Sequence, residues 1–139
     1  MKTARPGSVK KDPPHAFLGA QPGDSAAAEP RVKLWMEQGG LLVFSDYRMQ
    51  LLQHVADTES LAQAAECMGL SYRRAWGKIK EIERNLGMRL VQSEVGGVGG
   101  GRTRLTPKGE KLLAQYRRFR AAVEADVDRE FTEAFGHEP

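Results

Sequence analysis

The sequence predicts a mainly α-helical fold with a small amount of β-structure: a winged helix-turn-helix with an N-terminal β-hairpin and a long C-terminal helix. Three observations support this prediction. Residues 60–76 have the pattern of two short helices joined by a tight glycine turn. Residues 88–94 and 102–107 have the composition of two strands on either side of a glycine run. Apolar residues then recur every three or four positions up to residue 135, as in one long amphipathic helix.

Length and composition indicate one domain, because 139 residues are too few for two ordinary ones. Residues 1–30 hold five of the seven prolines and little apolar periodicity. We therefore expect a disordered N-terminal arm there, a folded domain over residues 31–135 and a tail over residues 136–139. No apolar run is long enough for a membrane span or a secretory signal, and the single cysteine fits a reducing compartment. These features predict a cytoplasmic protein.

The charges are distributed unevenly along the chain. Residues 61–120 carry 13 Lys/Arg against 5 Asp/Glu, whereas residues 121–139 carry 1 against 6. A basic middle followed by an acidic end favours nucleic acid as a partner. From charge alone, solvated helix faces explain the pattern equally well.

The first structured element is predicted to be a short hairpin, because Val32, Leu34 and Met36 occupy alternate positions before Gly39 and Gly40. A helix follows, with two candidate capping residues and one apolar face: Ser45 or Asp46, and Tyr47, Leu51, Leu52 and Val55.

The helix-turn-helix follows from its capping residues. Ser60 can cap a helix over residues 61–68, Gly69 suits the left-handed position that ends it, and Ser71 can cap the second helix. On a helical wheel the apolar residues of the second helix share one arc: Tyr72, Ala75, Trp76, Ile79, Ile82 and Leu86. The opposite face is mostly cationic, with Gly77 at its centre, so the backbone there can approach a flat or grooved surface.

The arginines at the start of the second helix are the sharpest candidates for nucleic-acid contact. Arg73 and Arg74 lie where a recognition helix enters the major groove, and arginine pairs bidentately with guanine. The alternative is that both meet only phosphates or solvent. Lys78, Lys80 and Arg84 lie further along the helix and are expected to contact phosphates.

Four further residues belong to the candidate interface or border it. Arg102 and Arg104 follow the glycine run and share one strand face, which suits phosphate or minor-groove contact; solvated strand residues are the alternative. Tyr72 borders both faces of its helix, and its hydroxyl could reach a phosphate. Glu81 could accept a hydrogen bond from cytosine, but pairing with a neighbouring cation is the favoured interpretation.

An enzyme is not expected. The glycine run lacks the Gly-Lys-Ser/Thr of a phosphate loop, and no histidine, cysteine and carboxylate cluster has metal-ligand spacing, so we expect no cofactor and no metal. Cys67 could be a redox sensor, but a small buried helix residue is the favoured interpretation. Trp76 could stack on a base, but its position favours packing. Thr106 is expected to cap the last helix, with Pro107 at its first position.

Two stretches, "SLAQAAECMGLSYRRAWGKIKEIERNLG" and "GGVGGGRTRLTPKGEKLL", resemble the DNA-binding half of ModE, the molybdate-responsive bacterial regulators, and more distantly that of LysR-type regulators. The likeness covers about residues 31–135. It implies a homodimer on a palindromic operator in double-stranded DNA. Under it, the recognition helix opens with Ser71, Tyr72, Arg73 and Arg74, and residues 96–104 form the wing. It also implies dimerisation through the terminal strands and the long last helix, in which the contact residues are Leu112, Tyr116, Phe119, Val123 and Val127.

Full-length ModE-like regulators carry a second half that binds molybdate, and the residues after the last helix leave no room for one. We therefore expect no small-molecule ligand and no direct molybdate sensing by this chain. Two other hypotheses stay open: a winged-helix module that binds a protein rather than DNA, and a LysR-like regulator unrelated to molybdenum. A small nucleotide-dependent enzyme is a third, and it predicts nucleotide binding at the glycine run.

Overall fold

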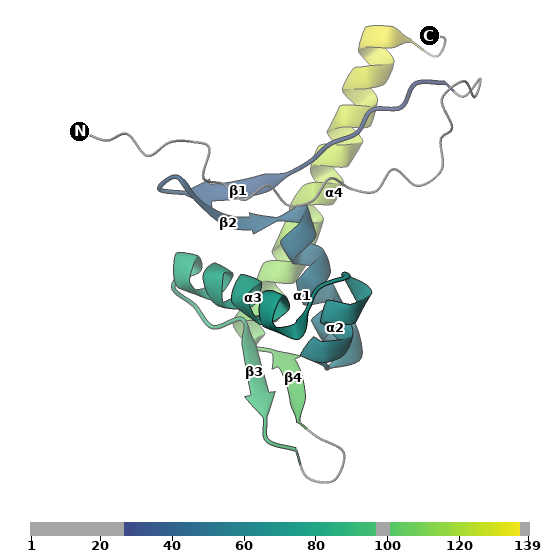
Figure 1. Ribbon diagram of the computed structural model, residues 1–139. Helices are drawn as coiled ribbons and strands as arrows, with labels where there is room; N and C mark the ends of the chain where they lie inside the picture. The colour runs from purple at the N-terminus through teal and green to yellow at the C-terminus, as the bar shows by residue number, and fades with distance from the viewer. Residues whose placement is uncertain (1–26, 97–100, 137–139) are drawn as a thin grey trace.

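The computed structural model describes residues 27–96 and 101–136, and within them it has the predicted winged helix-turn-helix architecture. The elements follow in this order along the chain (Figure 1): β1 (Trp35–Gln38), β2 (Leu41–Ser45), α1 (Asp46–Thr58), α2 (Leu61–Cys67), α3 (Tyr72–Leu86), β3 (Val91–Glu94), β4 (Arg102–Leu105) and α4 (Pro107–Phe135). Most of the expected N-terminal arm, part of the glycine run and most of the tail lie outside the described residues.

The N-terminal hairpin is confirmed. β1 and β2 pair antiparallel through a turn in which Gly39 and Gly40 have φ of 60° and 79°, values that glycine adopts without a steric cost. A bulge interrupts the pairing between Met36 and Glu37. The second hairpin, β3 with β4, forms the wing and extends away from the helices (Figure 1).

All four predicted helix caps are present. The hydroxyls of Ser45, Ser60, Ser71 and Thr106 each accept a hydrogen bond from a backbone N–H in the first turn of their helix. α2 ends one residue earlier than expected, at Cys67. Gly69 has a φ of 66°, and the N–H of Leu70 reaches back to the carbonyl of Ala65, which closes the turn of the helix-turn-helix.

The core lies between the three short helices, β2, the base of the wing and the first turns of α4. Its central side chains are Phe44, Leu51, Leu52, Val55, Leu61, Ala75, Ile79, Ile82, Leu90, Val91 and Leu113. One expectation about this core was wrong. Cys67 is exposed, because it lies off the face of α2 that carries Ala64 and Ala65. Tyr72, for which the sequence allows both packing and phosphate contact, is 58% exposed and lies outside the buried face of α3.

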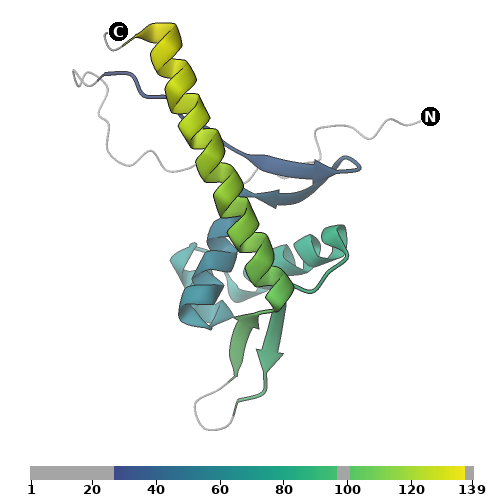
Figure 2. The same ribbon diagram turned by 180° about the vertical axis from the view of Figure 1, so that it is seen from behind.

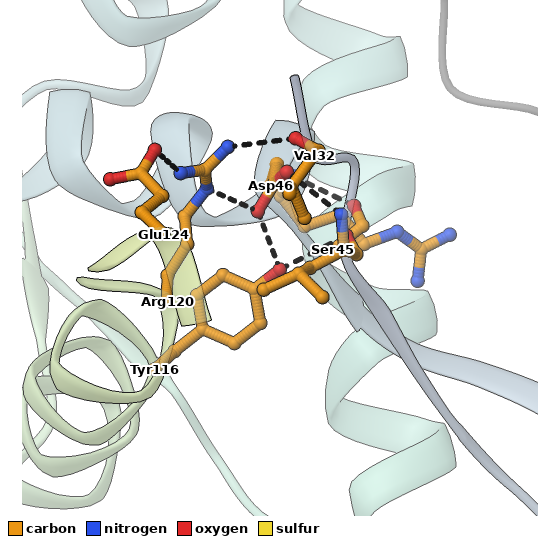
Figure 3. Close-up of polar contacts among 8 residues, drawn as sticks. Val32, Ser45, Asp46, Tyr116, Arg120 and Glu124 are labelled. Atoms are coloured by element: carbon orange, nitrogen blue, oxygen red, sulfur yellow. Dashed lines mark hydrogen bonds and ion pairs between the residues drawn. The ribbon is translucent and has the colours of Figure 1, made fainter. Parts of the chain in front are cut away.

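The long helix α4 is fixed to the rest of the domain by a polar cluster around Asp46 (Figure 3). The buried Asp46 carboxylate accepts hydrogen bonds from the Leu34 N–H, the Tyr116 hydroxyl and the Arg120 Nε. Arg120 also donates to the Val32 carbonyl at 3.1 Å. The chain before β1 therefore runs alongside α4, as the view from behind also shows (Figure 2).

Glu83 and Gly109 join α3 and α4 to the base of the wing. The buried Glu83 carboxylate accepts hydrogen bonds from the N–H groups of Leu90 and Val91 and from Lys80. Burial acts to raise the pKa of Glu83, but these donors outweigh it, so the pKa lies below its ordinary value. Only glycine fits at position 109, because a Cβ there would lie 2.2 Å from the Leu90 carbonyl oxygen.

Candidate nucleic-acid interface

The exposed face of α3 carries free arginines. Arg73, Arg74 and Arg84 are exposed, and none forms an ion pair with another described residue. Gly77 lies on the same face, and a Cβ there would meet nothing within 4 Å, so the packing of the domain does not require a glycine. The face is therefore open and positively charged, with its backbone accessible at the centre.

The start of α3 is exposed as well. Ser71 uses its hydroxyl to accept from the Arg74 N–H, which fixes the first turn. The Tyr72 side chain, at 58% exposure, stands at the same end. The N-terminal end of a helix attracts anions, because its first backbone N–H groups have no partner within the helix.

The two predicted lysines of α3 have contacts within the domain. The Nζ of Lys80 lies 3.0 Å from Oε1 of Glu83 and 4.5 Å from the centre of the Trp76 ring. The Nζ of Lys78 lies 5.0 Å from the centre of the Tyr47 ring. Trp76 is a packing residue, as expected, since it is partly buried against the core.

The wing arginines meet carboxylates. Arg102 Nη1 lies 3.4 Å from Glu59 Oε2, and Arg104 Nε lies 3.6 Å from Glu59 Oε1 and 3.7 Å from Glu94 Oε1. The predicted common face of Arg102 and Arg104 is confirmed by this shared partner. Glu59 caps the C-terminus of α1 with a φ of 52°, and it is the one non-glycine residue with positive φ in the part of the chain that the structure describes. A left-handed conformation of this kind costs a non-glycine residue roughly 1–2 kcal/mol.

Glu81 pairs with a cation, as the favoured interpretation held, and that cation is the buried Arg48. Oε2 of Glu81 lies 3.2 Å from Arg48 Nη2, whereas Nε and Nη1 of Arg48 have no hydrogen-bond partner among the described residues. The sequence did not reveal this pair, because its two residues lie 33 positions apart in the chain. Glu81 is thus held toward α1 and is not free to read a base.

A second basic surface was missed by the sequence analysis. A shallow groove of about 890 Å³ lies where the end of α3 meets the start of α4. Four cations line it: Lys80, Arg84, Arg89 and Lys108. Arg89 and Lys108 are exposed and belong to segments that the sequence assigned only to structure. The residues that line the groove come from separate segments of the chain, so no local sequence pattern predicts it.

The predicted dimerisation residues occupy different environments. Tyr116 is 2% exposed and packs edge-on against Phe44, so its assignment to a dimer interface is corrected: it belongs to the core of the single chain. Leu112 packs partly against the same core. Phe119 is 48% exposed. Val123 and Val127 are half-buried and line an apolar groove of about 420 Å³ with Pro30 and the last phenylalanines of α4.

Within residues 27–96 and 101–136, no group of three or more histidine, cysteine or acidic side chains is arranged to hold a metal ion. Over the same residues, no helix combines the length and apolar character needed to cross a membrane.

The fold and the exposed face of α3 define a winged helix-turn-helix protein. Residues 47–110, which run from α1 to the start of α4, match the family described as "Bacterial regulatory helix-turn-helix protein, lysR family". The fold is similar to that in "Crystal structure of CbnR_DBD-DNA complex", with a TM-score of 0.50, 23% identity and coverage of 64% of this chain and 98% of that one. It is also similar to that in "Crystal Structure of BenM_DBD/catB site 1 DNA Complex", with a TM-score of 0.51, 20% identity and coverage of 67% and 96%.

Curated relatives support the more specific resemblance. "Molybdenum-pterin-binding protein MopB" of Rhodobacter capsulatus is 40% identical over 80 residues, which are 58% of this chain and 28% of the relative. "DNA-binding transcriptional dual regulator ModE" of Escherichia coli (strain K12) is 39% identical over 69 residues, 50% of this chain and 26% of the relative. The resemblance to ModE-like DNA-binding regions is therefore confirmed. The chain spans only about a quarter of the length of these relatives.

Proposed function

We propose that the chain is a sequence-specific, DNA-binding transcriptional regulator of the ModE-like type, which acts by binding and not by catalysis. One observation carries the proposal: the exposed face of α3 holds Arg73, Arg74 and Arg84 without ion-pair partners among the described residues. Unpaired arginines on a solvated helix face are available for guanine edges and phosphates. The helix-turn-helix presents such a face to the major groove of duplex DNA.

The proposed contacts are of two kinds: contacts to base edges and contacts to the phosphates of the DNA backbone. Arg73 and Arg74, in the first turn of α3, read bases, and Ser71 and Tyr72 at the same end approach a phosphate. The absence of a side chain at Gly77 lets the helix lie close to the duplex. The remaining proposed contacts are to phosphates, from these residues: Lys78, Lys80, Arg84, Arg102 and Arg104.

The likeness to MopB and ModE, whose names refer to molybdenum, supports molybdenum-related genes as the regulated targets. The exposed Phe119 and the groove at Val123 and Val127 support a homodimer formed along α4, which would bind two half-sites related by two-fold symmetry. A DNA target places the protein in the bacterial cytoplasm.

The test is selection of bound duplexes from a randomised library by the full chain. The expected result is a two-fold symmetric motif with half-sites about one helical turn, or a multiple of it, apart. The affinity for that motif should fall linearly with the logarithm of salt concentration. Failure to bind any duplex at about 50 mM salt, where phosphate contacts are strongest, would overturn the proposal.

A second candidate function is a protein-interaction module that does not bind DNA. The apolar groove along the end of α4 favours it, because the groove is flanked by the exposed acidic residues Asp126 and Glu130. A partner of this kind would be basic and amphipathic. The same salt titration separates the two functions, since only the first predicts duplex binding.

A further inference from the structure

The carboxylate of Glu59 lies close to both wing arginines. Its two oxygens lie 3.4 Å from Arg102 Nη1 and 3.6 Å from Arg104 Nε. Both arginine side chains are partly exposed, at 61% and 42%. The Nε of Arg104 is buried, so a phosphate would reach Arg104 through the exposed part of its side chain. Guanidinium binds carboxylate and phosphate in the same way, through charge-assisted N–H···O contacts.

The attachment of the wing to α1 does not depend on this carboxylate. The buried Thr103 donates its backbone N–H to the Glu59 carbonyl oxygen at 3.0 Å. That bond joins β4 to the end of α1 through main-chain atoms alone. The side chain of Glu59 can therefore change without releasing the strand, which leaves an electrostatic effect on the arginines as its main consequence.

We infer that Glu59 is an affinity-setting residue: it competes with DNA phosphates for Arg102 and Arg104 and weakens binding to any duplex. The inference rests on the proposed function. When DNA binds, each guanidinium exchanges the carboxylate for a phosphate, and the released Glu59 carboxylate lies close to the negative backbone. DNA binding therefore loses the free energy of the contacts of Glu59 with Arg102 and Arg104. It is weakened further by the repulsion between the Glu59 carboxylate and the DNA phosphates.

The test is Glu59→Gln in the full chain, which keeps the size of the side chain and removes its charge. At about 50 mM salt the dissociation constant for the selected duplex should fall about two- to fivefold, the range expected for solvated ion pairs. In the wild type, the Glu59 carboxylate released on DNA binding takes up a cation, which reduces the net number of cations released. Glu59→Gln removes this uptake, so the slope of log affinity against log salt should steepen by up to about one unit. Base preference should not change, since the wing contacts only the backbone.

Glu66→Gln is the matched control. Glu66 is exposed on the neighbouring helix α2 and forms no ion pair with another described residue, so its neutralisation changes net charge by the same amount. Its effect on affinity should be less than half that of Glu59→Gln. Arg104→Gln should also weaken binding more in the Glu59→Gln background than in the wild type, because only there is Arg104 free of Glu59.

The outcomes separate the two claims. If the wild type binds its selected duplex and Glu59→Gln binds with the same affinity and salt slope, the role of Glu59 is refuted and the DNA-binding function stands. Equal tightening by Glu66→Gln also refutes it, because the effect is then one of net charge. If the wild type binds no duplex, the proposed function fails and this inference fails with it.

Discussion

The Nε of Arg120, in the fourth turn of α4, lies 2.8 Å from Oδ1 of the buried Asp46 at the start of α1. The same oxygen accepts from the Tyr116 hydroxyl at 2.7 Å (Figure 3). Arg120 also contacts Glu124 and the Val32 carbonyl. One carboxylate thus connects α1, α4 and the chain before β1, and it fixes the direction in which the long helix leaves the domain.

Replacement of that carboxylate should destabilise the domain strongly. Asp46→Asn removes the charge that pairs with Arg120 and replaces the acceptor of the Leu34 N–H with an amide NH2, which cannot accept a hydrogen bond. Loss of one partner of a buried ion pair costs about 3 kcal/mol. Chemical denaturation, followed by circular dichroism, measures the change in the free energy of unfolding. Asp57→Asn is the control, because Asp57 is exposed on the same helix and its change should stay within about 0.5 kcal/mol. Equal effects of the two substitutions would contradict the role of Asp46.

Stability should fall in acid through Glu83. Because its pKa is lower in the folded chain than its ordinary value, the unfolded chain takes up a proton first as the pH falls. The contribution of Glu83 is therefore fully present above its ordinary pKa and is lost as the pH falls through its folded pKa. Glu83→Gln should be less stable than the wild type near pH 7, and the difference should shrink toward pH 3. Urea unfolding over this range measures it, and a difference that is constant with pH would argue against the assignment.

Mutations of base-contacting and of phosphate-contacting residues should have different effects on DNA binding. Arg73→Ala should lower the preference for the selected motif over mismatched duplexes, by about 1–3 kcal/mol if Arg73 pairs with guanine. Arg104→Ala should weaken binding to all duplexes alike and reduce the salt dependence. Fluorescence anisotropy with matched and mismatched duplexes distinguishes the two effects. An equal loss of preference in both variants would argue against the division of roles.

The proposed dimer should depend on Phe119. Phe119→Asp places a charge on the exposed part of the α4 stripe and should yield monomers in sedimentation velocity. Ala121→Asp is the control, because Ala121 is exposed on a different face of α4 and should leave the dimer intact. Tyr116 is unsuitable for this test, since it is buried in the single chain and its loss would unfold the domain. A dimer that survives Phe119→Asp would place the interface elsewhere.

The basic groove between α3 and α4 should add to duplex affinity if phosphates reach it. Arg89→Gln with Lys108→Gln should weaken binding to all sequences and lower the salt slope by up to about two units, roughly one for each phosphate contact. Lys111→Gln with Arg118→Gln removes the same charge from exposed positions outside the groove and serves as the control. Equal losses in the two double variants would mean that the groove has no special role.

Local patterns in the sequence were enough to predict the helices and strands and where each helix begins. Ser45, Ser60, Ser71 and Thr106 cap their helices through bonds that reach only three residues along the chain, and Gly69 ends α2 through its own backbone conformation. Such contacts are local, so the order of residue types is enough to reveal them. The apolar spacing of α3 and the likeness to ModE followed from the same information.

The pairing of distant polar groups could not be predicted from the sequence, because it depends on how the elements pack together. The wing arginines lie 43 and 45 residues away in the sequence from their partner Glu59. Arg48 and Glu81 are 33 residues apart, and Tyr116 and Asp46 are 70 residues apart. Tyr116 and Phe119 belong to one apolar stripe in the sequence, yet one is buried and the other exposed, because the remainder of the domain covers α4 only near its start. A helical repeat specifies which side chains share a face, whereas the packing of distant elements determines how much of that face is covered.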